Sequence, residues 1–528
     1  MCLFCQKPYK KITRHLEQVH GEEPQVRVIV EMDVKSQKIE RRVAWEQLRN
    51  LGNFQHNHRV YQSMGPTDQL VSKRKSTDLT SPDSSSMLRA CPWCKAFLHK
   101  DWLHKHRRNC HMAPAENTTH AEYRAQSRAL LPVHASELDP AFVQRVLSTL
   151  SDDEVGRLVR SEPLILRFGY NKFKKTEREE HIGNVISSKM REIARLVLVG
   201  RKTQSGLEYM EDFIKPGNFR KVVECVKEMT DYNSESGMYR TPTVVLSLGH
   251  TLKKIAKIYH TNGIIENDFA KMRTGDDFVK LYKANWDHEV SSMALKTYYK
   301  KKSFNIRLLP LVKDVEKLYE HIKQNARNAQ DYDSRIKYTQ CYILMFNRKR
   351  GGEIQRLKKV DVANAYKSQE VDEEVMKTLT DVEKQLVKTT SRIEITGKRG
   401  RVALLLTNHM VELLEQICKE NEHVPSQYVF SRMSTASQRP YRSSDLLRKI
   451  VKEVPELEAP DRMTWTTLRH HLASMAQVYA ITQGEEDLLA QYMGHDIRIH
   501  RRYYRLPMAV LQRGFVCGLL HKNVGKWK

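Results

Sequence analysis

The last third of the chain carries the side chains needed to break a phosphodiester bond without a metal ion or a nucleotide. Such a reaction requires a nucleophile, cations that stabilise the negative charge of the transition state, and an acid that protonates the departing oxygen. The segment supplies two arginines, a lysine in a glycine-rich turn, a histidine and a later tyrosine: Arg350, Arg469, Lys398, His495 and Tyr504. Because no other stretch of the sequence is so rich in reactive side chains, we expect the chemistry of the protein here.

Two short segments near the N-terminus combine a close cysteine pair with two further metal ligands. The first segment contains Cys2, Cys5, His15 and His20. The second contains Cys91, Cys94 and His106, with Cys110 or His111 as the fourth donor. Two cysteines from a tight knuckle and two ligands about one helical turn apart are what tetrahedral Zn²⁺ requires. The sequence therefore predicts two small modules folded by structural zinc, since each is too short for an apolar core.

Composition and charge narrow the range of partners. The chain has 528 residues, with 89 Lys and Arg against 63 Asp and Glu, and a formal net charge of +26. This excess favours a polyanionic partner, and we predict double-stranded DNA. Nine cysteines are too few for a disulfide scaffold, and no stretch approaches the roughly 18 apolar residues of a membrane helix. We expect no membrane association.

Apolar periodicity predicts a mainly helical chain with one small sheet. Amphipathic helices are expected near 178–199, 218–230, 242–260, 276–286, 310–326, 333–347, 408–421, 443–453, 464–480 and 485–493. Residues 392–395 and 402–406 flank the sequence Gly-Lys-Arg-Gly, which predicts a β-hairpin with a basic tip at Lys398. Residues 27–32 read as a short strand, and 62–86 as a flexible linker that is rich in Ser and Pro.

The ordered set of motifs resembles the tyrosine recombinase, or phage integrase, family over roughly residues 325–510. The resemblance rests on an Arg-x2-Glu turn, a hairpin Gly-Lys, a Leu-Arg-His, a Met-Gly-His and a tyrosine nine residues later: Arg350 with Glu353, Lys398, Arg469, His495 and Tyr504. The zinc modules and the segment order are most similar to eukaryotic recombinases of Crypton-type mobile elements, or host genes descended from them. The resemblance implies an α+β fold, mainly α with a small β-sheet.

The resemblance also implies a role for each residue in DNA recombination or integration. Tyr504 would attack the scissile phosphate and form a 3′-phosphotyrosyl link, which conserves the bond energy so that no ATP is needed. Arg350, Arg469 and His495 would hydrogen-bond the non-bridging oxygens, and Lys398 would protonate the leaving 5′-oxygen. Glu353 would orient the basic groups, and no cofactor would take part in catalysis.

One position departs from the family pattern. Thr466 stands three residues before Arg469, where the family usually carries a histidine, and a hydroxyl cannot act as a general base near pH 7. Two interpretations follow: an active recombinase, or a domesticated, catalytically weak or inactive recombinase fold that binds DNA or chromatin through its zinc modules. Tyr503 is the rival nucleophile, and His470 and His471 are read as structural.

The predicted organisation has seven segments. They are a zinc-finger-like module at 1–22, a linker with a short strand at 23–88, a second module at 89–112, a linker with helices at 113–159, a helical core-binding domain that clamps DNA at 160–305, a tyrosine recombinase-like catalytic domain at 306–520 and a basic tail at 521–528. We expect self-association on DNA and a location in the nucleus. Residues 73–75 suit either a nuclear import signal or a solvated linker.

Overall fold

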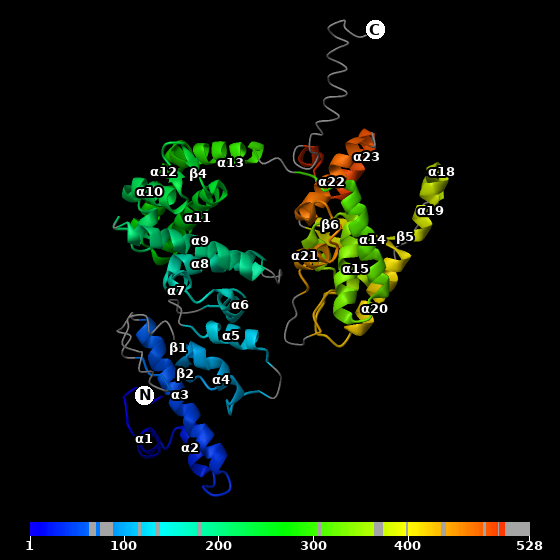
Figure 1. Cartoon of the computed structure of the whole chain (residues 1–528). Helices are drawn as coiled ribbons and strands as arrows, with labels where there is room; N and C mark the ends of the chain where they lie inside the picture. The colour runs from blue at the N-terminus through cyan, green and yellow to red at the C-terminus, as the bar shows by residue number, and fades with distance from the viewer. Residues whose placement is uncertain are drawn as a thin grey trace, which may run out of the picture. The chain divides into compact units, whose positions relative to one another are not determined.

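The computed structural model forms two compact units, Met1–Asn305 and Ile306–Lys528 (Figure 1). The residues that the structure describes are 1–62, 70–73, 88–114, 118–131, 138–176, 182–203, 205–304, 308–363, 373–397, 400–433, 440–478, 482–494 and 496–501. None of the described helices combines the length and the apolar character needed to cross a membrane.

The first unit begins with three helices around the first Cys/His segment: α1 (Ile12–Val19), α2 (Pro24–Glu31) and α3 (Lys38–Gln62). The predicted strand at 27–32 is wrong, because nearly all of these residues belong to α2. Pro24 presets the first helical turn. Val26 and Ile29, three residues apart, share one face and pack against Leu16 and Leu48. The predicted linker at 23–88 therefore contains two helices, α2 and α3. The β-branched residues of α2 favour a strand, but tertiary packing of its apolar face favours the helix.

The second Cys/His segment forms a small α+β module. Its elements are β1 (Leu88–Ala90), β2 (Phe97–His99), the 3-10 turn η3 (Lys100–Trp102), α4 (Leu103–Arg108) and α5 (His120–Ala129). The strands are antiparallel, with Arg89 opposite Leu98. Thr119 caps α5, because its hydroxyl accepts a hydrogen bond from the Glu122 N–H.

The rest of the first unit is a helical domain with one continuous apolar core, whose members run from Phe142 to Ala294. Its helices are α6 (Pro140–Arg145), α7 (Glu154–Ser161), α8 (Pro163–Thr176), α9 (Ile182–Lys202), α10 (Phe219–Met229), α11 (Pro242–Glu266), α12 (Phe269–Trp286) and α13 (Ser292–Phe304). Shorter elements are η4 (Leu147–Thr149), η5 (Asp212–Ile214), η6 (Pro216–Asn218), the π-helical turn η7 (Asp287–Ser291), and the strand pair β3 (Tyr232–Asn233) and β4 (Met238–Tyr239).

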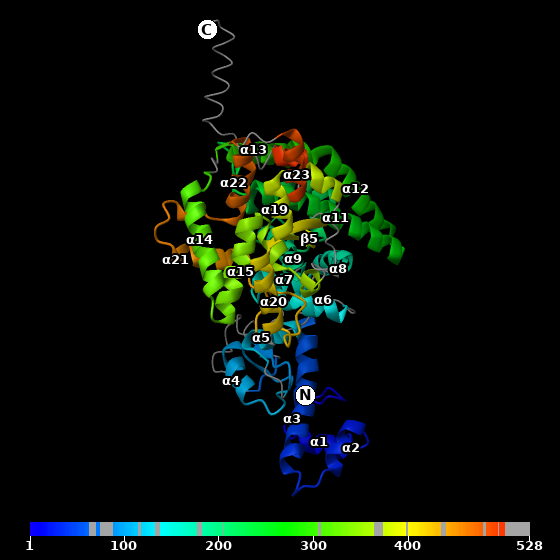
Figure 2. The same cartoon turned by 90° about the vertical axis from the view of Figure 1, so that its right-hand side faces the viewer.

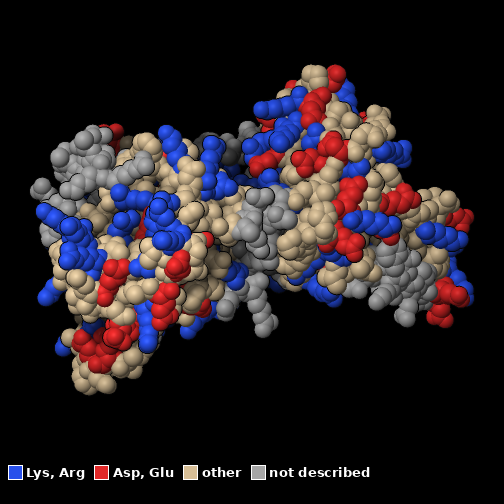
Figure 3. Space-filling view, turned by 90° about the horizontal axis from the view of Figure 1, so that it is seen from below, with Lys and Arg blue, Asp and Glu red and all other residues tan. Residues whose placement is uncertain are grey.

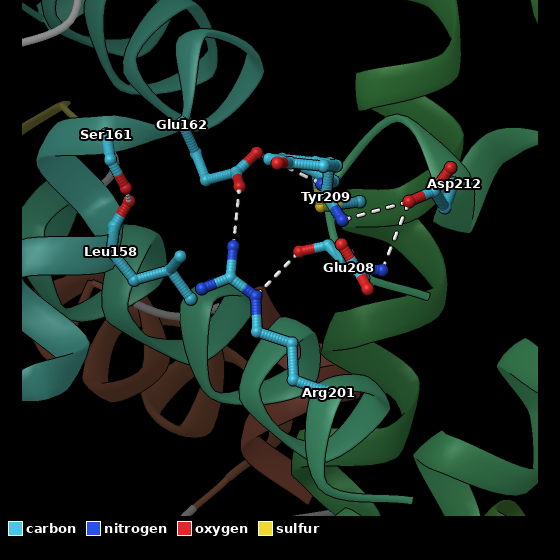
Figure 4. Close-up of polar contacts among 8 residues, drawn as sticks. Leu158, Ser161, Glu162, Arg201, Glu208, Tyr209 and Asp212 are labelled. Carbon is cyan, nitrogen blue, oxygen red and sulfur yellow. Dashed lines mark hydrogen bonds and ion pairs between the residues drawn. The ribbon is translucent and has the colours of Figure 1, made fainter. Parts of the chain in front are cut away.

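Two carboxylates fix the loop that follows α9 (Figure 4). Glu162 is buried and accepts hydrogen bonds from the Met210 N–H at 3.0 Å and from Arg201 at 3.4 Å. Asp212 accepts two more, from the N–H groups of Glu208 and Tyr209, at 3.1 and 2.9 Å. Burial raises the pKa of Glu162. These bonds satisfy backbone groups that a loop would otherwise leave unpaired.

The second unit packs helices around a two-stranded sheet. Its helices are α14 (Val312–Asn328), α15 (Tyr332–Asn347), α16 (Gly351–Gln355), α17 (Lys359–Ala363), α18 (Glu373–Thr378), α19 (Asp381–Thr389), α20 (Asn408–Glu420), α21 (Ser443–Glu453), the 3-10 turn η9 (Pro460–Arg462), α22 (Trp465–Val478), α23 (Gln483–Tyr492) and α24 (Ile497–Ile499). Helices α14 and α15 lie side by side (Figures 1 and 2). The buried α15 contributes much of the core of this unit, including Ile336, Cys341 and Leu344.

The sheet of the second unit is the predicted hairpin, β5 (Thr390–Gly397) and β6 (Gly400–Thr407). Gly397 pairs with Gly400, so two residues connect the strands. Inward residues alternate with outward ones, and Ile393, Ile395 and Leu404 are buried in the core. The prediction of a mainly helical fold with a small β-sheet is confirmed, and the first unit adds two short antiparallel strand pairs, β1–β2 and β3–β4.

Candidate active site and metal centres

The segment that follows α15 turns sharply at Arg348. Its backbone is left-handed, with φ of 51°, and its N–H donates to Leu344 O at 2.9 Å, which closes the helix. A residue with a Cβ adopts this conformation at a cost of roughly 1 kcal/mol. The turn directs the Arg348 carbonyl to Arg469, which donates to it at 2.7 Å.

Arg350 lies immediately before α16 and is held by Glu353. The Arg350 N–H and guanidinium donate to the two carboxylate oxygens of Glu353, at 3.1 and 2.8 Å. Glu353 is buried, whereas about a quarter of the Arg350 side chain is exposed. A second guanidinium nitrogen of Arg350 reaches Gly494 O at 3.5 Å. Glu353 thus fixes the position of the Arg350 side chain, and its orienting role in catalysis stays a prediction.

Arg469 comes from α22 and reaches the same turn after α23. It is buried, and it donates to Met493 O at 3.1 Å as well as to Arg348 O. Gly494 has φ of +67°, and a Cβ there would lie 3.1 Å from a methyl group of Val402, so glycine suits this position. The structure thus brings Arg350 and Arg469 together on consecutive carbonyls, Met493 and Gly494.

Three further side chains fix this turn. Lys349 is buried, donates to the Tyr492 carbonyl and lies 3.4 Å from the centre of the Tyr492 ring. The Tyr492 hydroxyl donates to Asn347 Oδ1. Asn347 also exchanges two hydrogen bonds with the backbone of Leu405 in β6, at 2.7 and 2.8 Å. Residues 347–350 therefore connect the hairpin, α15 and the turn at 492–494, which we name the 492–494 turn.

The neighbourhood of the two arginines is strongly cationic. Burial lowers the pKa of Lys349 to about 7, Glu353 opposes this shift, and Arg469 and Arg350 add to it. Burial likewise lowers the pKa of Arg348 to about 10. Converging cations of this kind suit a phosphate, whose negative charge would offset their mutual repulsion. Lysine and arginine side chains are also spread over the face drawn in Figure 3, with carboxylates between them.

The other predicted catalytic residues differ in where they lie. Lys398, His495 and Tyr504 fall outside the described residues, as does Tyr503. Thr466 is exposed in the first turn of α22, one turn before Arg469. His470 and His471 are buried beside Arg469, which fits the structural role expected of them. Burial, with Arg348 nearby, lowers the pKa of His471.

The first Cys/His segment gathers its four predicted ligands. The donor atoms of Cys2, Cys5, His15 and His20 lie within 4.8 Å of one another. The Cys5 sulfur lies 3.4 Å from His15 Nε2, close to the spacing of about 3.5 Å between sulfur and nitrogen around a tetrahedral zinc ion. A hydrogen bond with His20 lowers the pKa of the Cys5 thiol to about 6. The donor set suits a metal ion, since the thiolate is the ligating form.

The second segment also forms a four-ligand cluster, and here the structure selects between two donors. Cys91, Cys94, His106 and Cys110 lie within the same mutual distance. The Cys91 and Cys110 sulfurs are 4.0 Å apart, and the Cys94 sulfur is 3.3 Å from His106 Nε2. His111 is exposed and outside the cluster. The fourth donor of this cluster is therefore Cys110, four residues beyond His106 and just past the end of α4.

Comparisons with known proteins give few matches. No family model matches the chain, and no curated protein matches it in sequence. Among solved structures, the crystal structure of XerA recombinase aligns with 67% of this chain and 98% of its own, at 14% identity and a TM-score of 0.26. The XerH site-specific recombinase, bound to difH substrate in a pre-cleavage complex, aligns with 71% of this chain and 97% of its own, at 16% identity and a TM-score of 0.29.

Sequence reasoning missed the residues that fix the 492–494 turn. Lys349 precedes a predicted catalytic arginine, yet a lysine in a basic run reads as a solvated cation. Asn347 and Tyr492 lie at the ends of helices, where polar residues are common. The available signal was the position of Asn347 directly after the apolar run at 341–346, because an amide buried with that run needs hydrogen-bond partners.

Proposed function

We propose that this protein is a DNA-binding tyrosine recombinase or integrase that breaks and rejoins DNA strands through a 3′-phosphotyrosyl intermediate. One observation carries the proposal: Arg350, just before α16, and Arg469, in α22, bond to consecutive carbonyls of the 492–494 turn. Two guanidinium groups fixed side by side match two non-bridging oxygens of one phosphate. The turn leads directly to position 495, where the sequence supplies the next phosphate ligand, His495.

The proposed reaction assigns one step to each group. The Tyr504 oxygen bonds to phosphorus as its phenolic proton passes to solvent water, and the bond from phosphorus to the 5′-oxygen breaks. Lys398 gives the departing 5′-oxygen a proton. Arg350, Arg469 and His495 neutralise the charge that builds up on the non-bridging oxygens. Attack by a 5′-hydroxyl on the phosphotyrosine reverses these steps and seals the strand.

The two Cys/His clusters are proposed zinc sites. Cys2, Cys5, His15 and His20 would hold one ion, and Cys91, Cys94, His106 and Cys110 the other. Bound zinc would supply folding free energy to modules whose apolar cores are small, and it would take no part in strand cleavage. The proposal further includes double-stranded DNA as partner, self-association on that DNA, action in the nucleus and descent from a Crypton-type mobile element.

The proposal can be tested by covalent trapping. Full-length protein is incubated with a pool of duplexes that carry random sequence and a nick beside each candidate site, so that the released fragment diffuses away. We expect a denaturant-resistant protein–DNA adduct that Tyr504→Phe abolishes and that Tyr503→Phe, the matched control, retains. Sequencing of the captured DNA identifies the target.

Thr466 supports a second candidate function. Its hydroxyl stands on an exposed helix surface one turn from Arg469, where the family usually has a histidine. A chain that has lost catalysis would bind the same DNA through its cationic surfaces and metal modules. Wild-type protein that binds its selected DNA tightly yet forms no adduct would establish this function and overturn the first.

A further inference from the structure

The second metal module borders a pocket that the proposed reaction does not use. The pocket has a volume of about 810 Å³, within the usual range for small-molecule sites. Six cations from four elements line it, and we call it the arginine pocket: Arg89 of β1, Lys100 of η3, Arg107 and Arg108 of α4, and Arg124 and Arg128 of α5. Cations from four separate elements meet there because β1, α4 and α5 pack into one module.

The carboxylates of the arginine pocket do not balance its cations. Asp152 already pairs with Arg89, and Asp101 lies 3.2 Å from the ring of His99. Lys100, Arg108 and Arg124 are exposed, and within the described part of the chain no acidic side chain pairs with them. His104 and His120 also line the pocket. Lys100, Arg108 and Arg124 therefore line the hollow without an acidic partner among the described residues.

Groups around the arginine pocket respond to its positive charge. Burial, with smaller contributions from Arg128 and Arg89, lowers the pKa of Arg160 to about 9. Burial lowers the pKa of His120, with contributions from Arg124, Arg107 and His104. Like charges brought this close repel one another, and a bound polyanion would offset that repulsion.

The arginine pocket is built on the second metal cluster. Helix α4 carries the ligand His106 next to Arg107 and Arg108. Tyr123, which lines the pocket, donates a hydrogen bond from its hydroxyl to the Cys91 sulfur at 3.1 Å. A metal ion bound in this cluster would thus fix both helix α4 and the wall of the pocket at Tyr123.

We propose that the arginine pocket binds a cluster of phosphate groups, supplied either by a free polyphosphorylated small molecule or by a short stretch of a nucleic acid strand. The guanidinium group of an arginine donates two parallel hydrogen bonds to the oxygens of a phosphate. The concave shape of the pocket lets several cations reach neighbouring phosphates. The site lies on the first unit and is separate from the proposed strand-cleaving residues, so it does not depend on recombinase activity.

The test measures binding of inorganic tripolyphosphate to the full chain by calorimetry, and of a labelled eight-nucleotide single strand by fluorescence anisotropy. We expect one site, and Arg108→Ala with Arg124→Ala should weaken binding at least tenfold. The control, Arg42→Ala with Arg49→Ala, removes the same charge from exposed positions of α3 and should change affinity by less than about twofold. Tyr504→Phe should have no effect.

Each result separates the sources or overturns the proposal. If the Arg108→Ala, Arg124→Ala variant, here called the pocket variant, loses tripolyphosphate binding, a free polyphosphate is a sufficient ligand. If tripolyphosphate does not bind, but strand binding falls in the pocket variant alone, the phosphates come from nucleic acid. If both double variants weaken binding equally, or neither does, the proposal is wrong. An Arg108→Lys, Arg124→Lys variant, which keeps the charge, should recover part of the affinity.

Discussion

Arg350 and Arg469 donate hydrogen bonds to adjacent carbonyls of one turn, Gly494 O at 3.5 Å and Met493 O at 3.1 Å. The backbone thus sets the spacing of the two guanidinium groups, independently of any ligand. Arg350 retains exposed surface, while Arg469 is buried. Preorganised donors of this kind need little rearrangement when charge develops on a phosphate.

Replacing either arginine tests this arrangement. Arg350→Ala or Arg469→Ala should each lower the rate of covalent adduct formation by about 100–1,000-fold, because one fixed donor to the transition state is lost. Rates are measured under single-turnover conditions with the trapped DNA, and Arg448→Ala, an exposed arginine of the same unit, serves as the control. Unchanged rates in both variants would refute a role in catalysis.

Lys349 should give the second unit a distinctive pH dependence. Its pKa is lowered to about 7 in the folded protein and is near 10.4 in an unfolded chain. Between these values the unfolded chain binds a proton that the folded chain lacks, so stability should rise with pH from about 7 to 10. Lys349→Met should remove this rise.

The measurement is denaturant unfolding of both proteins at pH 7 and pH 9.5. The exposed lysine variant Lys452→Met provides the comparison, and it should follow the wild-type profile. A wild-type profile that matches that of Lys349→Met would contradict a lowered pKa.

The zinc content of variants should show whether Cys110 or His111 is the fourth ligand of the second module. Wild-type protein should carry two Zn²⁺ ions per chain, one for each cluster. Cys110→Ser should reduce this to one, whereas His111→Ala should retain both. Elemental analysis of dialysed protein provides the number, and Cys418→Ser, outside both clusters, controls for loss of a thiol. Loss of zinc from His111→Ala would point to the other donor.

Asn347 should contribute strongly to stability. Asn347→Ala removes partners from the Leu405 backbone and from Tyr492, which we expect to cost about 2–4 kcal/mol of unfolding free energy. Asn325→Ala, which removes an amide bonded within its own helix, should cost less than about 1 kcal/mol. Equal losses of unfolding free energy in the two variants would mean that the hydrogen bonds of Asn347 add little to stability.

The sequence alone determined what depends on local spacing. Helical periodicity located the helices α9–α12, α14, α15 and α20–α23, the Gly-Lys-Arg-Gly turn located the hairpin, and cysteine and histidine intervals located both Cys/His clusters. The catalytic roles of Arg350, Glu353, Lys398, Arg469, His495 and Tyr504 stay predictions from motif order. These patterns are readable because hydrogen bonds and ligand geometry within a turn of chain involve neighbouring residues.

Only the tertiary structure decided what depends on contacts between distant segments. It selected Cys110 over His111, made α2 a helix through packing against Leu16, and placed residues 347–350 against the 492–494 turn. It also gathered the cations of the arginine pocket from four elements. No local pattern encodes such contacts, because their free energy comes from burial and from hydrogen bonds that exist only after the chain has folded.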